Sequence, residues 1–217
     1  MKKLIALGLC GLLGLAMVTG QTARADDTLS LARLKPGSVL RGHFIQERSL
    51  QGFQAPLKSE GSFVVAEGKG LIWRVEKPFA TVTVITPAGL VQNAQGTETL
   101  RLPADRIPFI ARFYEMLSGT MTGDLNGLTQ QFDVKKSGTA ADWSLQLTPK
   151  SAAGSSSADA QNMPIQRLDL AGDQYVKSVD IQRQNGDRDQ LTFLDQHLDA
   201  QPLSAEETAL LAGAGDK

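Results

Sequence analysis

The segment from Gly61 to Thr86 constrains the fold more than any other part of the chain. Apolar and polar residues alternate in it through Leu71 and Trp73 and again through Val82 and Val84, a pattern typical of strands with one apolar face. Two glycines and a Lys-Pro pair divide the segment into three runs. It therefore predicts a three-stranded antiparallel meander, whose apolar face is either the floor of an ordinary core or the wall of a cavity for an apolar ligand.

The first 25 residues have the features of a targeting segment. Two lysines precede an apolar run from Leu4 to Val18, and Ala23-Arg24-Ala25 forms a small-x-small cleavage site. The run is shorter than the ~20 apolar residues of a comfortable membrane span. We therefore expect residues 1–25 to be a cleaved signal peptide and residues 26–217 to form one exported domain, since one core suffices for a chain of that length.

Cysteine content and charge restrict the compartment and the partners. Cys10 is the only cysteine and lies within the signal, so the mature chain has neither a disulfide nor a thiolate nucleophile. An exported, cysteine-free chain indicates a bacterial periplasm. Loss of residues 1–25 removes three basic residues and no acidic one, which lowers the formal charge from −1 to −4. This mildly acidic, evenly spread charge disfavours binding to nucleic acid or to an anionic membrane surface.

Strand signals continue on both sides of a single strong helical pattern. That pattern begins at Asp105 and ends at Gly119, and weaker helices are expected at 27–34 and 204–211, the last with a capping box of Ser204 and Glu207. About ten strands with short turns predict a mainly β protein with an antiparallel sheet, one face of which the central helix covers. Outside the opening meander, the expected strands are 39–48, 89–94, 97–102, one resuming at Phe132, 143–147, 165–170, 175–183 and 190–194.

The mature sequence contains no recognisable catalytic or metal-binding set. His43 and His197 are isolated and are expected to be solvated surface residues. The run from Asn185 to Asp189 resembles only part of a calcium loop and lacks its closing glutamate, so a turn with solvated carboxylates is favoured. Phosphate loops, dinucleotide fingerprints and nucleophile elbows are absent from the sequence. We therefore expect a protein that is not an enzyme and that uses no metal and no cofactor.

The strands and the central helix each present an apolar face. On the sheet these residues are Leu71, Trp73, Val82 and Val84. On the helix they are Phe109, Phe113, Met116 and Leu117. The two faces pack together as a conventional core, which periodicity alone favours, or the helix is a lid whose side chains an acyl chain replaces over a concave sheet. The residues by themselves leave both alternatives open.

Short motifs follow one another along nearly the whole mature chain. They are Gly42-x-Phe44-x-Gln46, Gly61-x-Phe63, Gly70-Leu71-Ile72-Trp73, Lys77-Pro78-Phe79, Val84-Ile85-Thr86, Gly123-Asp124, Leu147-Thr148-Pro149-Lys150 and the strand pair 179–183 and 190–194. Their order resembles that of the periplasmic lipoprotein carrier LolA and its relatives. The resemblance implies a half-open antiparallel β-barrel of about ten to eleven strands, closed by a helical lid and holding acyl chains in an apolar cavity.

This resemblance also implies a function and the residues that carry it. LolA-like proteins take lipidated proteins from an inner-membrane ABC transporter and pass them to an outer-membrane acceptor. The wall of the cavity would comprise Phe63, Leu71, Trp73, Val82 and Val84. The lid would comprise Phe109, Phe113, Met116 and Leu117. The expectation is a monomeric periplasmic carrier of lipoprotein or lipid cargo; the alternatives are a sensor or protein-interaction module on the same fold and a hydrolase of exported lipids.

One position departs from the family pattern. In the register set by Trp73, Glu67 replaces the characteristic arginine that helps to hold the lid shut in these carriers. Lys69 is close in sequence, but an ammonium does not reproduce the fork of donors of a guanidinium. We therefore expect Glu67 and Lys69 to act at the gate and expect the gating to differ from that of the best-studied carriers.

Overall fold

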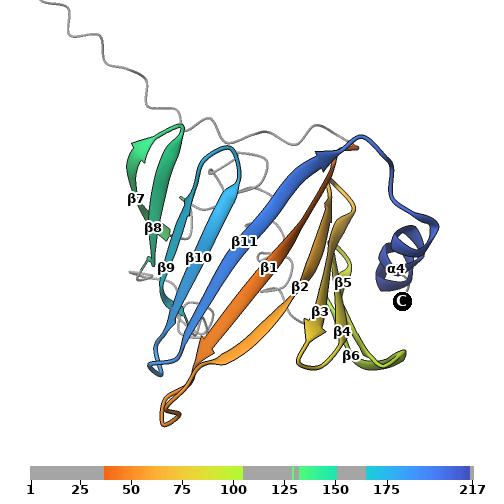
Figure 1. The fold of residues 1–217 in the computed structure, drawn as a ribbon, viewed down its shortest axis with the longest axis horizontal. Helices are drawn as coiled ribbons and strands as arrows, with labels where there is room; N and C mark the ends of the chain where they lie inside the picture. Colours follow the sequence, from red (N-terminus) through yellow and green to blue (C-terminus); the bar gives the residue numbers. More distant parts are fainter. Residues whose placement is uncertain (1–36, 105–128, 130–131, 151–164, 216–217) are drawn as a thin grey trace, which may run out of the picture.

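The computed structural model describes residues 37–104, 129, 132–150 and 165–215, and these form a strongly β structure (Figure 1). One antiparallel sheet contains the strands in the order β6-β5-β4-β3-β2-β1-β11-β10-β9-β8-β7. The strands are β1 (Val39–Ser49), β2 (Leu57–Ala66), β3 (Gly70–Lys77), β4 (Thr81–Thr86), β5 (Gly89–Ala94), β6 (Thr97–Pro103), β7 (Phe132–Thr139), β8 (Asp142–Pro149), β9 (Ile165–Gly172), β10 (Val176–Arg183) and β11 (Arg188–Asp199).

Two consecutive meanders, β1 to β6 and β7 to β11, make up the sheet. They join where β1 pairs with β11, so the first and last strands lie side by side at the centre (Figure 1). The described sheet is not closed, because β6 and β7 are its two edges. These observations confirm the prediction of a mainly β, half-open antiparallel architecture. The helices expected at 27–34 and 105–119, the latter with the lid residues, lie outside the described residues.

The opening meander forms where the sequence predicts it, as β2, β3 and β4. A break in register between Glu60 and Gly61 marks the β2–β3 pair. At this bulge a Cβ on Gly61 would lie 1.8 Å from the carbonyl oxygen of Arg74, so only glycine lets the two backbones approach so closely. The Gly61-x-Phe63 motif thus has a local structural cause.

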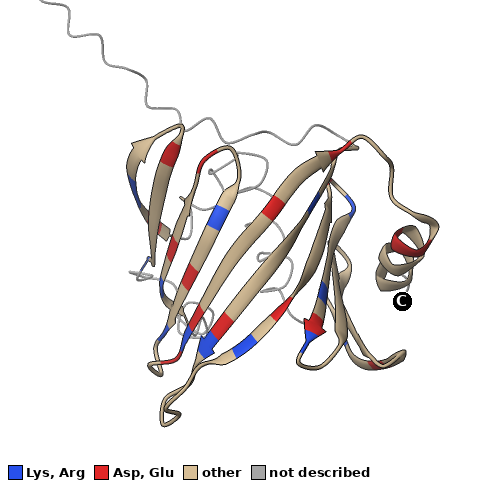
Figure 2. Cartoon of the chain, viewed as in Figure 1, with Lys and Arg blue, Asp and Glu red and all other residues tan. Residues whose placement is uncertain are grey.

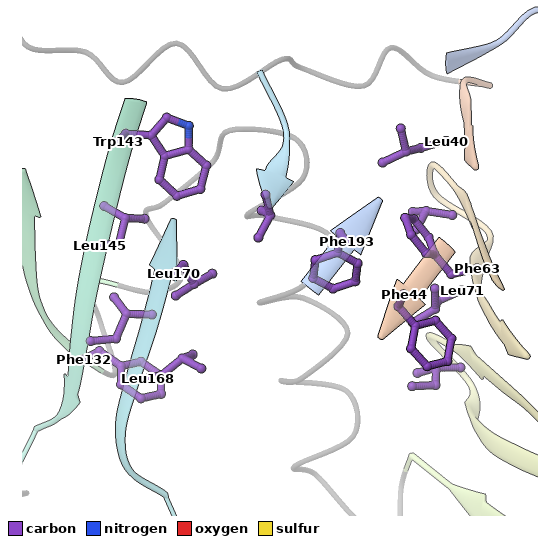
Figure 3. Close-up of a cluster of buried hydrophobic side chains, with 14 residues drawn as sticks. Leu40, Phe44, Phe63, Leu71, Phe132, Trp143, Leu145, Leu168, Leu170 and Phe193 are labelled. Atoms are coloured by element: carbon purple, nitrogen blue, oxygen red, sulfur yellow. The ribbon is translucent and has the colours of Figure 1, made fainter. Parts of the chain in front are cut away.

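Apolar side chains occur on both faces of the sheet. The larger cluster lies on the face that we call the inner face, where side chains from the two meanders point toward one another (Figure 3). In this view Trp143 and Leu145 of β8 and Leu170 of β9 lie across from Phe44 of β1 and Phe193 of β11. The core is therefore shared between segments that are far apart in sequence.

The C-terminal helix α4 (Ala205–Gly215) packs on the outer face over β3, β4 and β5. Leu211 and Ala214 of α4 join a second buried cluster on this face that includes Ile72 and Val84. The predicted capping box is present: the Oγ atom of Ser204 accepts from the backbone N of Glu207 at 3.1 Å, and a Glu207 oxygen accepts from the backbone N of Ser204 at 2.7 Å. The helix predicted at 204–211 is thus confirmed and extends to Gly215.

An ion-pair network holds α4 to the central strands. Arg41 of β1 donates from Nη1 and Nη2 to the carboxylate of Glu207, the latter at 3.1 Å, and from Nε to Asp199 at 2.7 Å. Burial alone would raise the pKa of Glu207, but the hydrogen bonds from Arg41 and Ser204 outweigh it and lower that pKa. Glu207 therefore stays ionised at neutral pH.

Candidate ligand-binding site

A pocket of about 280 Å³ lies on the inner face of the sheet. Its walls come from both meanders, and most of the side chains that line them are apolar. The first meander contributes Leu71, Trp73 and Ile85, while Leu170, Ile181 and Phe193 represent the second. Ligand sites in proteins are concave, mostly apolar and begin at roughly 300 Å³. The pocket therefore has the chemistry and nearly the size of a small apolar binding site.

Four aromatic rings pack together at one wall of this pocket, and two of them, Trp73 and Phe193, line it. Trp73 stacks on Phe44 with ring centroids 3.7 Å apart, and Phe193 meets Phe63 edge to face at 5.4 Å. A Cβ on Gly42 would lie 2.8 Å from the Phe63 ring, so glycine at this position lets the ring lie flat against β1. Phe44 and Phe63 are buried beneath Trp73, which is half-buried and reaches the pocket. The wall is thus preformed by aromatic packing.

Charged and amide side chains stand at the end of the pocket where β1, β10 and β11 meet. Asp189 of β11 is 1% exposed and accepts four hydrogen bonds. Its Oδ1 atom accepts from Nε of Arg48 at 2.5 Å and from Nε2 of Gln46 at 3.1 Å, while Oδ2 accepts from Nε and Nη2 of Arg183 at 3.1 and 2.8 Å. All four residues line the pocket.

The strand register explains how this polar group is assembled. Arg48 and Asp189 are direct partners in the β1–β11 pairing, and Gln46 lies two residues before Arg48, on the same face. Burial would raise the pKa of Asp189, but the hydrogen bonds and charges of Arg48 and Arg183 outweigh it and hold that pKa below its usual range. The carboxylate is therefore ionised at neutral pH.

The structure brings together three of the sheet residues expected at the site. Leu71 and Trp73 line the pocket, and Phe63 supports Trp73 from beneath, with ring centroids 6.2 Å apart. The four predicted lid residues, Phe109, Phe113, Met116 and Leu117, lie outside the described residues. Of the residues named from the sequence, two on β3 line the pocket, and the lining residues on β8 to β11 were not among those named.

Val82 and Val84 lie on the outer face, which corrects their predicted place beside Trp73. Trp73 pairs with Thr83 across β3 and β4, and successive side chains of a strand point to opposite faces. The two valines accordingly pack in the cluster beneath α4, whereas Thr83 and Ile85 line the pocket.

The gating candidates lie in the tight turn between β2 and β3. The backbone N of Glu67 donates to the carbonyl of Ser38 at 3.1 Å, and that of Lys69 donates to the carbonyl of Ala66 at 3.0 Å. Glu67 is half-buried, Lys69 is exposed, and neither lines the pocket. Their proposed contact with a lid involves residues beyond the described ones.

The carboxylate of Asp189 is a second correction, because the sequence predicted a solvated one. Asp187 in the same turn accepts from the backbone N of Gln51 at 2.9 Å and is only partly buried, but Asp189 is fully buried. A signal was present: Asp189 is in phase with Leu191 and Phe193, which face inward. His43 and His197 are exposed, as predicted.

Within ranges 37–104, 132–150 and 165–215, His, Cys, Asp and Glu side chains do not gather in threes with a geometry suited to a metal ion. Among the helices of the described part of the chain, none is long and apolar enough to cross a membrane.

Several solved structures of low sequence identity align with most of this chain. A LolA superfamily protein from Nitrosomonas europaea is 9% identical, with 81% of this chain and 92% of that chain covered and a TM-score of 0.41. The MucA/MucB complex of Pseudomonas aeruginosa gives 14% identity, 83% and 57% coverage and a TM-score of 0.44. LprF from Mycobacterium bovis is 10% identical, with 76% of this chain and 89% of that chain covered and a TM-score of 0.34. No curated protein matches the sequence.

A protein-family model supplies the assignment. The model for LolA-like outer membrane lipoprotein carrier proteins matches residues 19–195, which is well over half of the 217-residue chain. The matched region includes strands β1 to β10, most of β11 and every residue that lines the pocket. The chain therefore belongs to the LolA-like family of outer membrane lipoprotein carrier proteins.

Proposed function

We propose that this protein is a periplasmic carrier that binds acyl chains in the inner-face pocket and moves them from the inner to the outer membrane. The observation that carries the proposal is the pocket itself, with Leu71, Trp73 and Phe193 among its apolar walls. Transfer of an acyl chain from water contributes ~0.8 kcal/mol per buried CH₂. Burial of several CH₂ groups of an acyl chain in such a pocket would therefore supply ample binding affinity.

The polar end of the pocket does not suggest catalysis. A general acid or base needs a proton to give or a lone pair to accept one. Both oxygens of Asp189 are occupied by donors, and its lowered pKa leaves it ionised at neutral pH. This agrees with membership of a carrier family, whose members are typically non-enzymatic.

Partners follow from the family rather than from the pocket. Membership of the family leads us to expect an acylated lipoprotein or a lipid as the cargo. The donor would be an inner-membrane ABC transporter, and the acceptor would lie in the outer membrane. The carrier would act as a monomer, with Phe109, Phe113, Met116 and Leu117 as a lid that repacks when the ligand leaves. Such repacking would offset part of the free energy lost on release.

Acyl binding can be measured with Trp73 as the reporter. The chain has two tryptophans, and Trp143 is 1% exposed and outside the pocket lining, so a Trp143→Phe background isolates the Trp73 signal. We expect a saturable change in fluorescence when a medium-chain acyl ligand is added. An unchanged signal, confirmed by the absence of heat in calorimetry, would contradict the proposal.

A matched pair of variants on β11 tests where the ligand lies. Leu191 is half-buried and lines the pocket, whereas Leu194 is on the other face and 40% exposed. Leu191→Asp places a charge in the apolar wall and should weaken acyl binding by at least about tenfold. Leu194→Asp should bind like the parent, because its side chain meets water. Equal binding by the two variants would show that the ligand is elsewhere.

A further inference from the structure

One end of the apolar pocket carries an excess of positive charge. Among the residues that the structure describes, the charged ones in its lining are Arg48, Arg183 and Asp189, which gives two cations and one anion. Figure 2 shows basic and acidic segments close together at the ends of β1 and β11 where this group lies. The other described lining residues are apolar apart from Gln46 and Thr83. The pocket is therefore amphipathic, with one cationic end.

The acceptor sites of Asp189 are all occupied, whereas Arg48 and Arg183 have further N–H donors that do not bond to it. A carboxylate has about four lone-pair sites, and Asp189 accepts four hydrogen bonds. Each guanidinium has five N–H donors; Arg48 gives one of them to Asp189 and Arg183 gives two. The arginine side chains are 45% and 34% exposed, so their remaining donors are accessible to a ligand.

The buried carboxylate fixes both arginines before any ligand arrives. Asp189 is on β11, between Arg48 on β1 and Arg183 on β10, and its side chain is only 2% exposed. Because the two guanidiniums are already tethered, a bound anion would not have to order two long side chains. A guanidinium also presents paired donors that fit the two oxygens of a carboxylate or phosphate.

We propose that the ligand of this pocket is an anionic amphiphile, with its hydrocarbon chain against Trp73, Ile181 and Leu191 and its carboxylate or phosphate head on Arg48 and Arg183. The proposal deepens the carrier function and rests on it. It narrows the cargo to lipids that carry a free oxyanion, since an acyl chain linked through an ester or amide offers the cationic end only neutral carbonyl acceptors, without the charge that strengthens the hydrogen bonds.

Four ligands of one chain length test the charge preference on the intact protein. Calorimetry or Trp73 fluorescence would compare decanoate, decyl phosphate, decanol and decyltrimethylammonium, the ionic ligands below their micelle concentrations and decanol below its solubility limit. A charge-assisted hydrogen bond justifies an expected preference of roughly tenfold for the two anions over decanol, with the cation weakest. Inorganic phosphate and acetate are added as competitors, and we expect neither to displace decyl phosphate at equal concentration.

Substitutions should move this preference in opposite directions. Arg48→Gln and Arg183→Gln should each lower the ratio of decanoate to decanol affinity toward one, because each variant loses more affinity for the anion than for the neutral alcohol. Asp189→Asn removes the anion of the described pocket lining but keeps a carbonyl oxygen that accepts from an arginine, so it should raise the ratio. Arg188→Gln is the matched control, because Arg188 is equally exposed, at 46%, but pairs with Asp180 and does not line the pocket. Circular dichroism would verify that each variant is folded.

The outcomes separate this inference from the carrier function. Equal affinities for decanoate, decyl phosphate and decanol would overturn the anionic head group and leave acyl binding intact. Displacement of decyl phosphate by inorganic phosphate alone would show a site for free anions and would also overturn the proposal. If none of the four ligands binds, the carrier function fails together with it. An altered ratio in Arg188→Gln equal to that in Arg48→Gln would show a long-range charge effect and contradict direct contact.

Discussion

The two faces of one sheet differ in how their apolar side chains are covered. On the outer face, Ile72 and Val84 are almost completely buried beneath α4, which supplies Leu211 and Ala214 as their partners. On the inner face, the neighbouring residues Leu71 and Trp73 border a pocket of about 280 Å³. The same strands thus serve a sealed core on one side and a candidate binding surface on the other.

Each face also contains a buried carboxylate paired with arginine, and the two have different tasks. Glu207 pairs with Arg41 and caps α4, so its role is to attach the helix. Asp189 pairs with Arg48 and Arg183 inside the pocket lining, where two cations exceed one anion. The comparison teaches that the two groups have opposite charge balance: one arginine holds two carboxylates, Glu207 and Asp199, beside α4, whereas one carboxylate holds two arginines in the pocket lining.

The largest expected effect comes from truncating adjacent residues of β3. Ile72→Ala should cost about 2–5 kcal/mol of unfolding free energy, because Ile72 is fully buried in the sealed cluster. Leu71→Ala should fall near the lower end of that range, since one side of Leu71 already faces the pocket, and it alone should change acyl affinity. Urea unfolding and calorimetric titration measure both quantities. A larger loss for Leu71→Ala would contradict the distinction between the faces.

The sheet was predictable from the sequence because period-two alternation reports which segments are strands. It did not report which face each residue occupies. In β4, the more apolar set, Val82 and Val84, faces α4, and the set facing the pocket includes Thr83. When both faces of a sheet are partly apolar, the stronger alternation need not mark the binding face. The phase across a turn depends on strand register, which local pattern does not fix.

Asp189 escaped sequence reasoning for a different physical reason. Its neighbours in sequence, Asn185 and Gly186, form a polar turn, and a carboxylate there is normally solvated. The cost of burying the Asp189 carboxylate is offset by hydrogen bonds from Arg48, which is 141 positions away in sequence, and from Arg183. By contrast the cap of α4 was predictable, because Ser204 and Glu207 are only three residues apart.

A smaller effect is expected from neutralising the two buried carboxylates. Asp189→Asn should cost about 1–3 kcal/mol at neutral pH through weakened hydrogen bonds from two arginines. Glu207→Gln should cost less, because glutamine still serves the capping box. Chemical denaturation at pH 7 gives the two values. A larger cost for Glu207→Gln would show that the outer-face pair is the more important of the two.

The same variants have an expected pH signature. The folded-state pKa values of Asp189 and Glu207 are both lowered, since hydrogen bonds from arginine outweigh burial. Each carboxylate therefore stabilises the fold fully above its unfolded pKa, roughly 3.9 for Asp and 4.3 for Glu, and this contribution is lost as the pH falls through the lower folded value. The gap between parent and variant should narrow with acidification. A gap that stays constant below pH ~4 would contradict the cause assigned to these pKa shifts.

The smallest expected effect concerns the tie between β3 and the first turn of α4. Nη2 of Arg74 donates to a Glu206 oxygen at 2.8 Å, and the Glu206 side chain is 71% exposed. Exposed pairs of this kind are worth about 0.2–1 kcal/mol, so Arg74→Gln should lower the unfolding free energy by no more than that, and added salt should shrink the difference. Acyl binding should be unchanged, because Arg74 is not part of the pocket lining. A loss of affinity in this variant would show that α4 on the outer face is coupled to the pocket on the inner face, and the two faces would then have to be treated as one cooperative unit.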